Sequence, residues 1–129
     1  MTEEFDSRDY DTSDVGDSLR KYQEVTAATA MYPGAVLGNI DSINYLTLGL
    51  TGEAGEIANK VKKISRDNDG VITDEHRHTI LAEAGDVFWY LARLCDELGG
   101  DLAVVAQANI DKLLDRRERD VLGGSGDNR

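Results

Sequence analysis

Apolar residues recur every three or four positions along most of the chain, which is the spacing of one face of an α-helix. Alternating β-branched residues are scarce, so strands are not expected. The pattern predicts an all-α protein whose four helices span about residues 18–31, 42–66, 74–98 and 102–122. The breaks between them contain Pro33 with Gly34, the DNDG run at 67–70, and Gly99 with Gly100. Two long helices flanked by two shorter ones indicate a four-helix-bundle-like fold.

The two ends of the chain lack this periodicity. Residues 1–16 are acidic and rich in Ser and Asp, and residues 123–129 are rich in Gly and Ser. Such segments contain too few apolar residues to form a core. We therefore expect a flexible acidic N-terminal tail, one helical domain over residues 17–122, and a flexible C-terminal tail.

The two long helices carry the same arrangement of side chains. At about 100° per residue, each has an apolar stripe with a polar stripe beside it. We expect the two helices to pack antiparallel through their apolar stripes, so that the stripe residues form the core. These stripes consist of Leu46, Leu50, Ala54, Ile57, Val61 and Ile64, and of Ile80, Ala84, Val87, Leu91, Leu94 and Leu98. The expected N-caps of the second, third and fourth helices are Ser42, Thr73 and Asp101.

Each polar stripe contains an acidic tetrad, EAGE at 53–56 and EAGD at 83–86. The carboxylates occupy equivalent positions on the two helices, so antiparallel pairing brings four of them together. They are Glu53, Glu56, Glu83 and Asp86. Such a cluster is costly unless a cation compensates it, and Mg²⁺ or Mn²⁺ prefers oxygen ligands of this kind. The pattern therefore predicts a metal site.

An alternative explanation of the acidic pairs stays open at this point. A single ExxE pair on a helix is more often an exposed charged face, and Glu56 with Lys60 fits an i,i+4 ion pair. The occurrence of two matched copies favours the metal site. His76 and His78 lie about 200° apart on a helix, so we expect ordinary surface residues there and no histidine ligand.

Composition and charge exclude several classes of function. A chain of 129 residues suits one domain. Its 25 acidic and 14 basic residues give a net charge of −11, which disfavours nucleic acids and anionic membranes as partners. Cys95 is the single cysteine, which rules out an internal disulfide framework, and it is expected in the core. Neither a signal peptide nor a run of about 20 apolar residues is present, so we expect a cytoplasmic protein.

Three segments carry a family resemblance: LGLTGEAGEIANKVKK from Leu48, EAGDVFWYLARL from Glu83, and ANIDKLLDRR from Ala108. Together they resemble the MazG-like, all-α nucleoside triphosphate pyrophosphohydrolases, over about residues 22–116. The resemblance implies a helical bundle that assembles as a homodimer or homotetramer. It also implies Mg²⁺-dependent hydrolysis of (d)NTPs to (d)NMP and pyrophosphate, with Mn²⁺ as a possible substitute. The four tetrad carboxylates would be the metal ligands.

The chain departs from the family pattern at Gly52. Some relatives carry an additional glutamate there, giving EExxE, and that glutamate is a candidate general base. Its absence leaves two possibilities for the proton acceptor. Either the metal alone lowers the pKa of the attacking water, or a tetrad carboxylate such as Glu53 or Glu56 takes the proton.

Cationic and amide side chains are the candidates for binding phosphate oxygens. Asn109, Lys112 and Arg116 lie on one side of the last helix, and Lys60 and Lys63 lie beside the first tetrad. The candidate contact to the sugar or base is Tyr90, one turn after Asp86 on the same side. Weaker candidates are Tyr22, Asn44, Tyr45 and Trp89.

The sequence thus supports a metal-dependent hydrolase of (d)NTPs that acts in nucleotide-pool cleaning or control. Two alternatives remain, namely a dUTP- or dCTP-specific diphosphatase of the same superfamily, and a non-catalytic helical module whose acidic stripes bind a basic protein. Roughly a hundred folded residues leave apolar surface that four helices do not cover, so a homodimer or homotetramer is expected.

Overall fold

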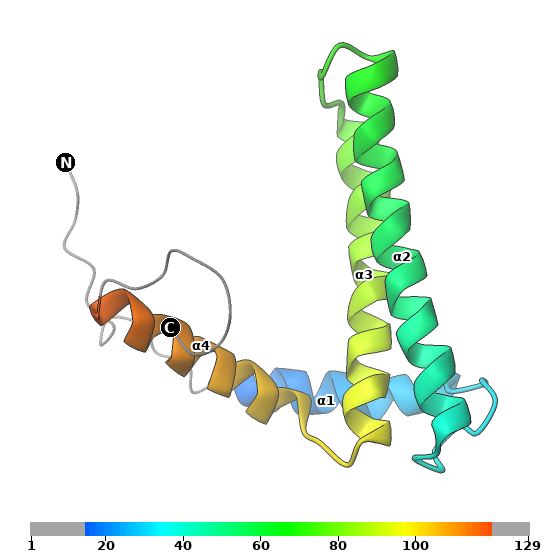
Figure 1. Ribbon diagram of the computed structural model, residues 1–129, viewed down its shortest axis with the longest axis vertical. Coiled ribbons are helices and arrows are strands. Elements are labelled where there is room, and N and C mark those ends of the chain that lie inside the picture. The colour runs from blue at the N-terminus through cyan, green and yellow to red at the C-terminus, as the bar shows by residue number, and fades with distance from the viewer. Residues whose placement is uncertain (1–14, 120–129) are drawn as a thin grey trace.

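The computed structural model describes residues 15–119. Within that range the elements are α1 (Val15–Thr26), the 3₁₀ helix η2 (Ala27–Thr29), α2 (Ile40–Asp67), α3 (Asp74–Glu97) and α4 (Leu102–Glu118), with no strand. The predicted all-α class and the two long central helices are confirmed. Helices α2 and α3 form a long antiparallel hairpin, and α1 and α4 lie across its base (Figure 1). None of the described helices combines the length and apolar character needed to span a membrane.

The ends of the first and last helices differ from the prediction. Helix α1 begins at Val15, inside the segment expected to be a tail, and it gives way to η2 well before Pro33. Thr26 and Thr29 each donate a hydroxyl to the carbonyl three residues earlier, as the helix tightens into this 3₁₀ turn. Helix α4 ends at Glu118, earlier than expected. The expected tail segments 1–14 and 123–129 lie outside the described residues.

The N-cap of α2 is Asn39, so the prediction of Ser42 is wrong. Asn39 is extended, and its side chain accepts a hydrogen bond from the Ser42 amide at 3.1 Å. Ser42 is fully buried inside the first turn and donates its hydroxyl to the Asn39 carbonyl at 2.8 Å. The predicted caps Thr73 and Asp101 are confirmed, since each accepts a bond from a backbone amide in the first turn of its helix.

The hairpin buries only part of the predicted apolar stripes. Leu46 and Ile64 are buried, whereas the other stripe residues are half-buried or exposed. Two helices can cover only the sides that face each other, so the flanks of each stripe stay open in a single chain. The half-buried residues are Leu50, Ile57, Ile80, Val87 and Leu94, with Cys95, and the exposed ones are Ala54, Val61, Ala84, Leu91 and Leu98.

A buried ion pair lies at the base of the hairpin. The side chains of Arg93 and Glu97, one turn apart on α3, are both 0% exposed, and Arg93 Nη2 lies 3.8 Å from Glu97 Oε1. Arg93 also donates from Nε to the Tyr32 hydroxyl at 3.2 Å and from Nη2 to Asp96 at 3.1 Å. A further bond from Nη1 reaches the Thr26 hydroxyl on α1. The guanidinium therefore joins α3 to α1 and to the connection between α1 and α2.

The Glu97 carboxylate holds that connection against the end of α3. It accepts hydrogen bonds from the Val36 amide at 2.7 Å, the Gly38 amide at 2.8 Å and the Tyr32 hydroxyl at 2.5 Å. Gly38 has φ +60, and a Cβ there would lie 2.8 Å from the Glu97 carbonyl oxygen, so only glycine fits. Burial alone would raise the Glu97 pKa, but these bonds outweigh it and lower the pKa.

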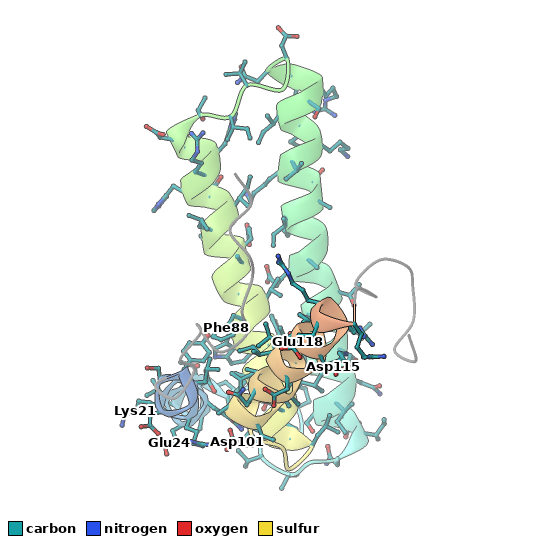
Figure 2. All side chains as sticks on the ribbon, turned by 90° about the vertical axis from the view of Figure 1, so that its left-hand side faces the viewer. Lys21, Glu24, Phe88, Asp101, Asp115 and Glu118 are labelled. Atoms are coloured by element: carbon teal, nitrogen blue, oxygen red, sulfur yellow. The ribbon has the colours of Figure 1, made fainter. Side chains whose placement is uncertain are left out.

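Gln23 fixes α1 to the junction between α3 and α4. Its amide nitrogen donates to the Gly100 carbonyl at 3.0 Å, and its amide oxygen accepts from the Leu102 amide at 2.7 Å. Tyr22, one residue earlier, packs its ring against Phe88 of α3 with centroids 4.7 Å apart. Figure 2 shows Phe88 in the region where α1 meets α3.

Arg93→Met should lower the free energy of unfolding by about 3–5 kcal/mol, because Glu97 is left buried without its cation. The matched control is Arg77→Met on the same helix, which removes an exposed arginine paired with Asp74. That change should cost less than about 1 kcal/mol. Urea unfolding of both variants measures the difference, and similar losses would contradict a structural role for the buried pair.

Glu97→Gln should weaken the dependence of stability on acidic pH. A lowered folded-state pKa means that the charged Glu97 stabilises the fold fully above the ordinary glutamate pKa, and that this stabilisation is lost as the pH falls through the lower folded-state value. The wild-type protein should therefore lose stability from about pH 4 downwards more steeply than the variant. Urea unfolding between pH 7 and pH 2 tests this, and parallel curves would refute it.

Candidate metal centre

Three carboxylates from the two hairpin helices meet midway along the hairpin. One carboxylate oxygen from each of Glu53 on α2 and Glu83 and Asp86 on α3 lies within 4.8 Å of the others. The antiparallel pairing expected from the matched tetrads produces this convergence. Glu56 is exposed and is not one of the three, because it lies about one turn further along α2. The structure thus brings together three of the four predicted metal ligands.

The cluster carries more negative charge than its neighbours compensate. The pKa of Glu53 is raised first by burial, then by a hydrogen bond with Glu83 and by repulsion from Asp86, Glu83 and Glu56. A single cation is paired with the cluster in the described part of the chain, since Lys60 Nζ lies 3.3 Å from Glu83 Oε1. Lys60 therefore pairs across the hairpin with Glu83, and the alternative pair of Glu56 with Lys60 is not the one that forms.

The donor set fits a hard divalent cation. All three converging groups are carboxylates, which Mg²⁺ and Mn²⁺ prefer, and neither histidine belongs to the group. A bound cation would also remove the repulsion that raises the Glu53 pKa. Glu53, Glu83 and Asp86 are thus the residues that would hold such an ion, and Glu56 is the nearest further carboxylate on α2.

Aromatic residues lie beside the carboxylates on the side towards the base of the hairpin. The Tyr90 ring lies 6.4 Å from that of Tyr45 and 5.1 Å from that of Trp89. Burial raises the pKa of Tyr90 most, followed by Tyr45 and by the negative charges of Glu53 and Asp86. Tyr90 therefore lies next to the cluster, as predicted, with the weaker candidates Tyr45 and Trp89 around it.

Gly49 is the reason that Tyr90 can take this position. A Cβ at Gly49 would collide with the Tyr90 Cε1 atom, so the ring packs directly on the α2 backbone. A Cβ at Gly52 would meet nothing within 4 Å. Of the two glycines near the carboxylates, only Gly49 is needed for packing in this chain.

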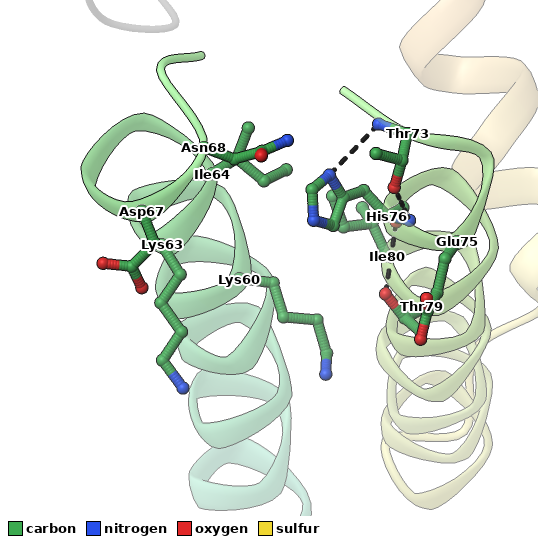
Figure 3. Close-up of a pocket in the computed structure, with 10 residues that line it drawn as sticks. All are labelled: Lys60, Lys63, Ile64, Asp67, Asn68, Thr73, Glu75, His76, Thr79 and Ile80. Carbon is green, nitrogen blue, oxygen red and sulfur yellow. Dashed lines mark hydrogen bonds between the residues drawn. The ribbon is translucent and has the colours of Figure 1, made fainter. Parts of the chain in front are cut away.

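A cavity of about 480 Å³ lies between α2 and α3 towards the tip of the hairpin (Figure 3). We call it the tip cavity. It includes the predicted phosphate-binding residues Lys60 and Lys63, and also residues that the sequence analysis did not select. Its lining consists of Lys60, Lys63, Ile64, Asp67, Asn68, Thr73, Glu75, His76, Thr79 and Ile80.

His76 is half-buried in this lining, so it differs from the surface residue expected, whereas His78 is exposed as predicted. A sequence signal for His76 and Thr79 did exist, because both continue the stripe of Glu83, Asp86 and Tyr90 at spacings of three and four residues. We call this stripe, together with Tyr45, Gly49, Glu53, Glu56, Lys60 and Lys63 on α2, the carboxylate face.

The polar residues predicted on the last helix are not brought to the carboxylates by the packing of α4. This helix packs on α1 and on α3, and it runs away from the hairpin (Figure 1). Asn109 and Lys112 are exposed on it, while Arg116 is 3% exposed. Their predicted role in binding phosphate stays a prediction.

Comparisons with known proteins identify the family of the chain. The family model described as the MazG nucleotide pyrophosphohydrolase domain matches residues 41–121. The chain is 57% identical over 111 residues to the Gene 37 protein of Mycobacterium phage L5, covering 84% of this chain and 96% of that protein. No solved structure matches the chain.

Gly49→Ala should destabilise the protein by about 1–3 kcal/mol, because the new methyl group displaces the Tyr90 ring. Gly52→Ala on the same helix is the matched control, and it should stabilise by up to about 1 kcal/mol through helix propensity. In a Tyr90→Ala background, Gly49→Ala should behave like the control. Urea unfolding of the set tests this. A stabilising Gly49→Ala in the wild-type background would show that Tyr90 does not pack on the α2 backbone.

Proposed function

Because the chain belongs to the MazG nucleotide pyrophosphohydrolase family, we propose that it hydrolyses (d)NTPs to (d)NMP and pyrophosphate with Mg²⁺, and that Mn²⁺ can substitute. The observation that carries this proposal is the convergence of Glu53, Glu83 and Asp86 between two helices. The same face places aromatic residues on one side of these carboxylates and lysines on the other. A nucleoside triphosphate has a base and sugar at one end, which match the aromatic residues, and a polyphosphate at the other end, which matches the lysines.

The carboxylates would hold the ion, with Glu56 completing the set. A bound Mg²⁺ supplies Lewis acidity towards a phosphoryl oxygen and makes a coordinated water easier to deprotonate. Glu53 is the proposed proton acceptor, in an outer-sphere position relative to the ion, because Gly52 has no side chain for that role. Lys60 lies 3.3 Å from Glu83, and it would neutralise charge on the phosphates once a cation replaces it there.

We propose that the protein works as a homodimer or homotetramer in the cytoplasm, in cleaning or controlling the nucleotide pool. The exposed stripe residues support an assembly, since Val61 is 48% exposed and Leu91 37% exposed on a hairpin that is open on its flanks. In such an assembly the exposed Asn109 and Lys112 would contact the triphosphate of a neighbouring chain, because α4 points away from its own hairpin, whereas the Arg116 side chain is buried.

A substrate panel tests the proposed activity. Pyrophosphate release from the eight common NTPs and dNTPs should occur with Mg²⁺ or Mn²⁺ and stop with EDTA. Release confined to dUTP or dCTP would identify the narrower diphosphatase instead. No release, together with no gain in thermal stability from Mg²⁺ plus a nonhydrolysable nucleotide, would favour the helical interaction module.

Asp86→Asn should lower turnover by at least about 100-fold, because loss of a direct metal ligand costs no less than loss of its supporting groups. Glu56→Gln should do the same if Glu56 completes the ligand set. Glu24→Gln, which removes an exposed carboxylate on α1, is the control and should keep full activity. Circular dichroism checks that each variant is folded. Retained activity in Asp86→Asn would contradict the assigned site.

A further inference from the structure

The carboxylate face has an order along the hairpin. Tyr45 and Tyr90 lie towards the base, the carboxylates lie in the middle, and the tip cavity follows on the other side. His76 precedes Glu83 by seven residues, which is about 10 Å along α3. Lys60 belongs to both regions, because its Nζ lies 3.3 Å from Glu83 and its side chain lines the tip cavity. The tip cavity therefore adjoins the proposed metal centre at Lys60.

The cap of α3 fixes which nitrogen of His76 carries its proton. Thr73 and His76 form a capping box, in which the Thr73 amide donates to His76 Nδ1 at 3.1 Å and the His76 amide donates to the Thr73 hydroxyl. An Nδ1 that accepts a bond has no hydrogen, so the proton of the neutral ring is on Nε2. Figure 3 shows the ring reaching from α3 towards α2, with Nε2 on the side away from Thr73. His76 thus offers a hydrogen-bond donor inside the tip cavity.

The lining of the tip cavity contains cationic donors although the protein is acidic overall. Lys60 and Lys63 contribute two positive charges to the lining. Its two carboxylates are Asp67 and Glu75, and Asp67 already accepts two hydrogen bonds from Arg66, at 2.7 and 2.8 Å. The Thr79 hydroxyl donates to the His76 carbonyl, so it is not a free donor here. Lys63 and the His76 Nε2–H remain to meet phosphate oxygens, and Lys60 would join them once a cation replaces it at Glu83.

We propose that the tip cavity binds the terminal phosphate of a nucleoside triphosphate, with His76 Nε2–H and Lys60 Nζ as donors. This inference rests on the proposed function, and it predicts the orientation of the bound substrate. The polyphosphate runs towards the hairpin tip, and the nucleoside lies towards Tyr45 and Tyr90. A nucleoside diphosphate would leave the tip cavity unfilled, so His76 contributes to the preference for triphosphates over diphosphates.

His76→Glu tests the proposal, because glutamate is a natural partner in a capping box and replaces the donor with a negative charge. We expect KM for the best triphosphate to rise at least 10-fold with little change in kcat, since the interaction exists before the reaction begins. The ratio of kcat/KM between triphosphate and the matching diphosphate should fall. His76→Gln, which keeps the cap and an amide donor, should stay within about 3-fold of wild type.

His78→Glu is the matched control, because it makes the same change of charge on an exposed position of the same helix. It should leave KM and the triphosphate preference unchanged. If both glutamate variants behave alike while the wild-type enzyme is active, the inference fails and the proposed function stands. Thermal unfolding of both variants checks that α3 is intact.

A wild-type protein that releases no pyrophosphate would contradict the proposed function, and the tip cavity is then tested by binding alone. The probe is inorganic triphosphate with Mg²⁺, and isothermal titration calorimetry measures its binding. Binding that is weakened at least 10-fold by His76→Glu, but not by His78→Glu, would support a polyphosphate site. Equal affinity in the two variants and the wild type, or no binding to any of them, would overturn it.

Discussion

The buried ion pair of Arg93 and Glu97 is the interaction on which the rest of this structure depends. Glu97 orders the connection between α1 and α2 by accepting hydrogen bonds from two of its backbone amides, and Arg93 donates a hydrogen bond to Thr26 of α1. Both charges contact Tyr32, whose ring stacks on Tyr45 at 5.5 Å. Tyr45 in turn lies beside Tyr90, next to the carboxylates. The same polar network that closes the base of the hairpin therefore positions the aromatic side of the proposed site.

Charged side chains have different surroundings at the base, the middle and the tip of the hairpin. At its base, a charge is buried with enough partners to offset its desolvation. At mid-height, three carboxylates converge with one paired cation among the described residues, and burial and like-charge repulsion raise the Glu53 pKa. At the tip, lysines and a capping histidine face a cavity. The stabilising ion pair and the proposed metal centre thus lie at different heights of the hairpin.

Much of this arrangement was predictable because it depends on periodicity. Helical spacing placed Glu53, Glu83 and Asp86 beside apolar stripes, and a short turn required the two helices to pair antiparallel. The N-cap of α2 was not predictable, since Asn39 and Ser42 are both good capping residues and burial of Ser42 decided between them. The exposure of Val61 and Leu91 also could not be read from the stripes, because it depends on what covers the flanks of the hairpin.

The sequence by itself determined the helices, the matched acidic tetrads and the face on which they lie, because these follow from side-chain spacing along one element. Only the tertiary structure decided which charges pair. Lys60 meets Glu83 across the hairpin instead of Glu56 on its own helix, and Tyr90 packs on the backbone of Gly49. Each of these contacts depends on the register and separation of two helices, and those quantities are set by packing between segments distant in the sequence.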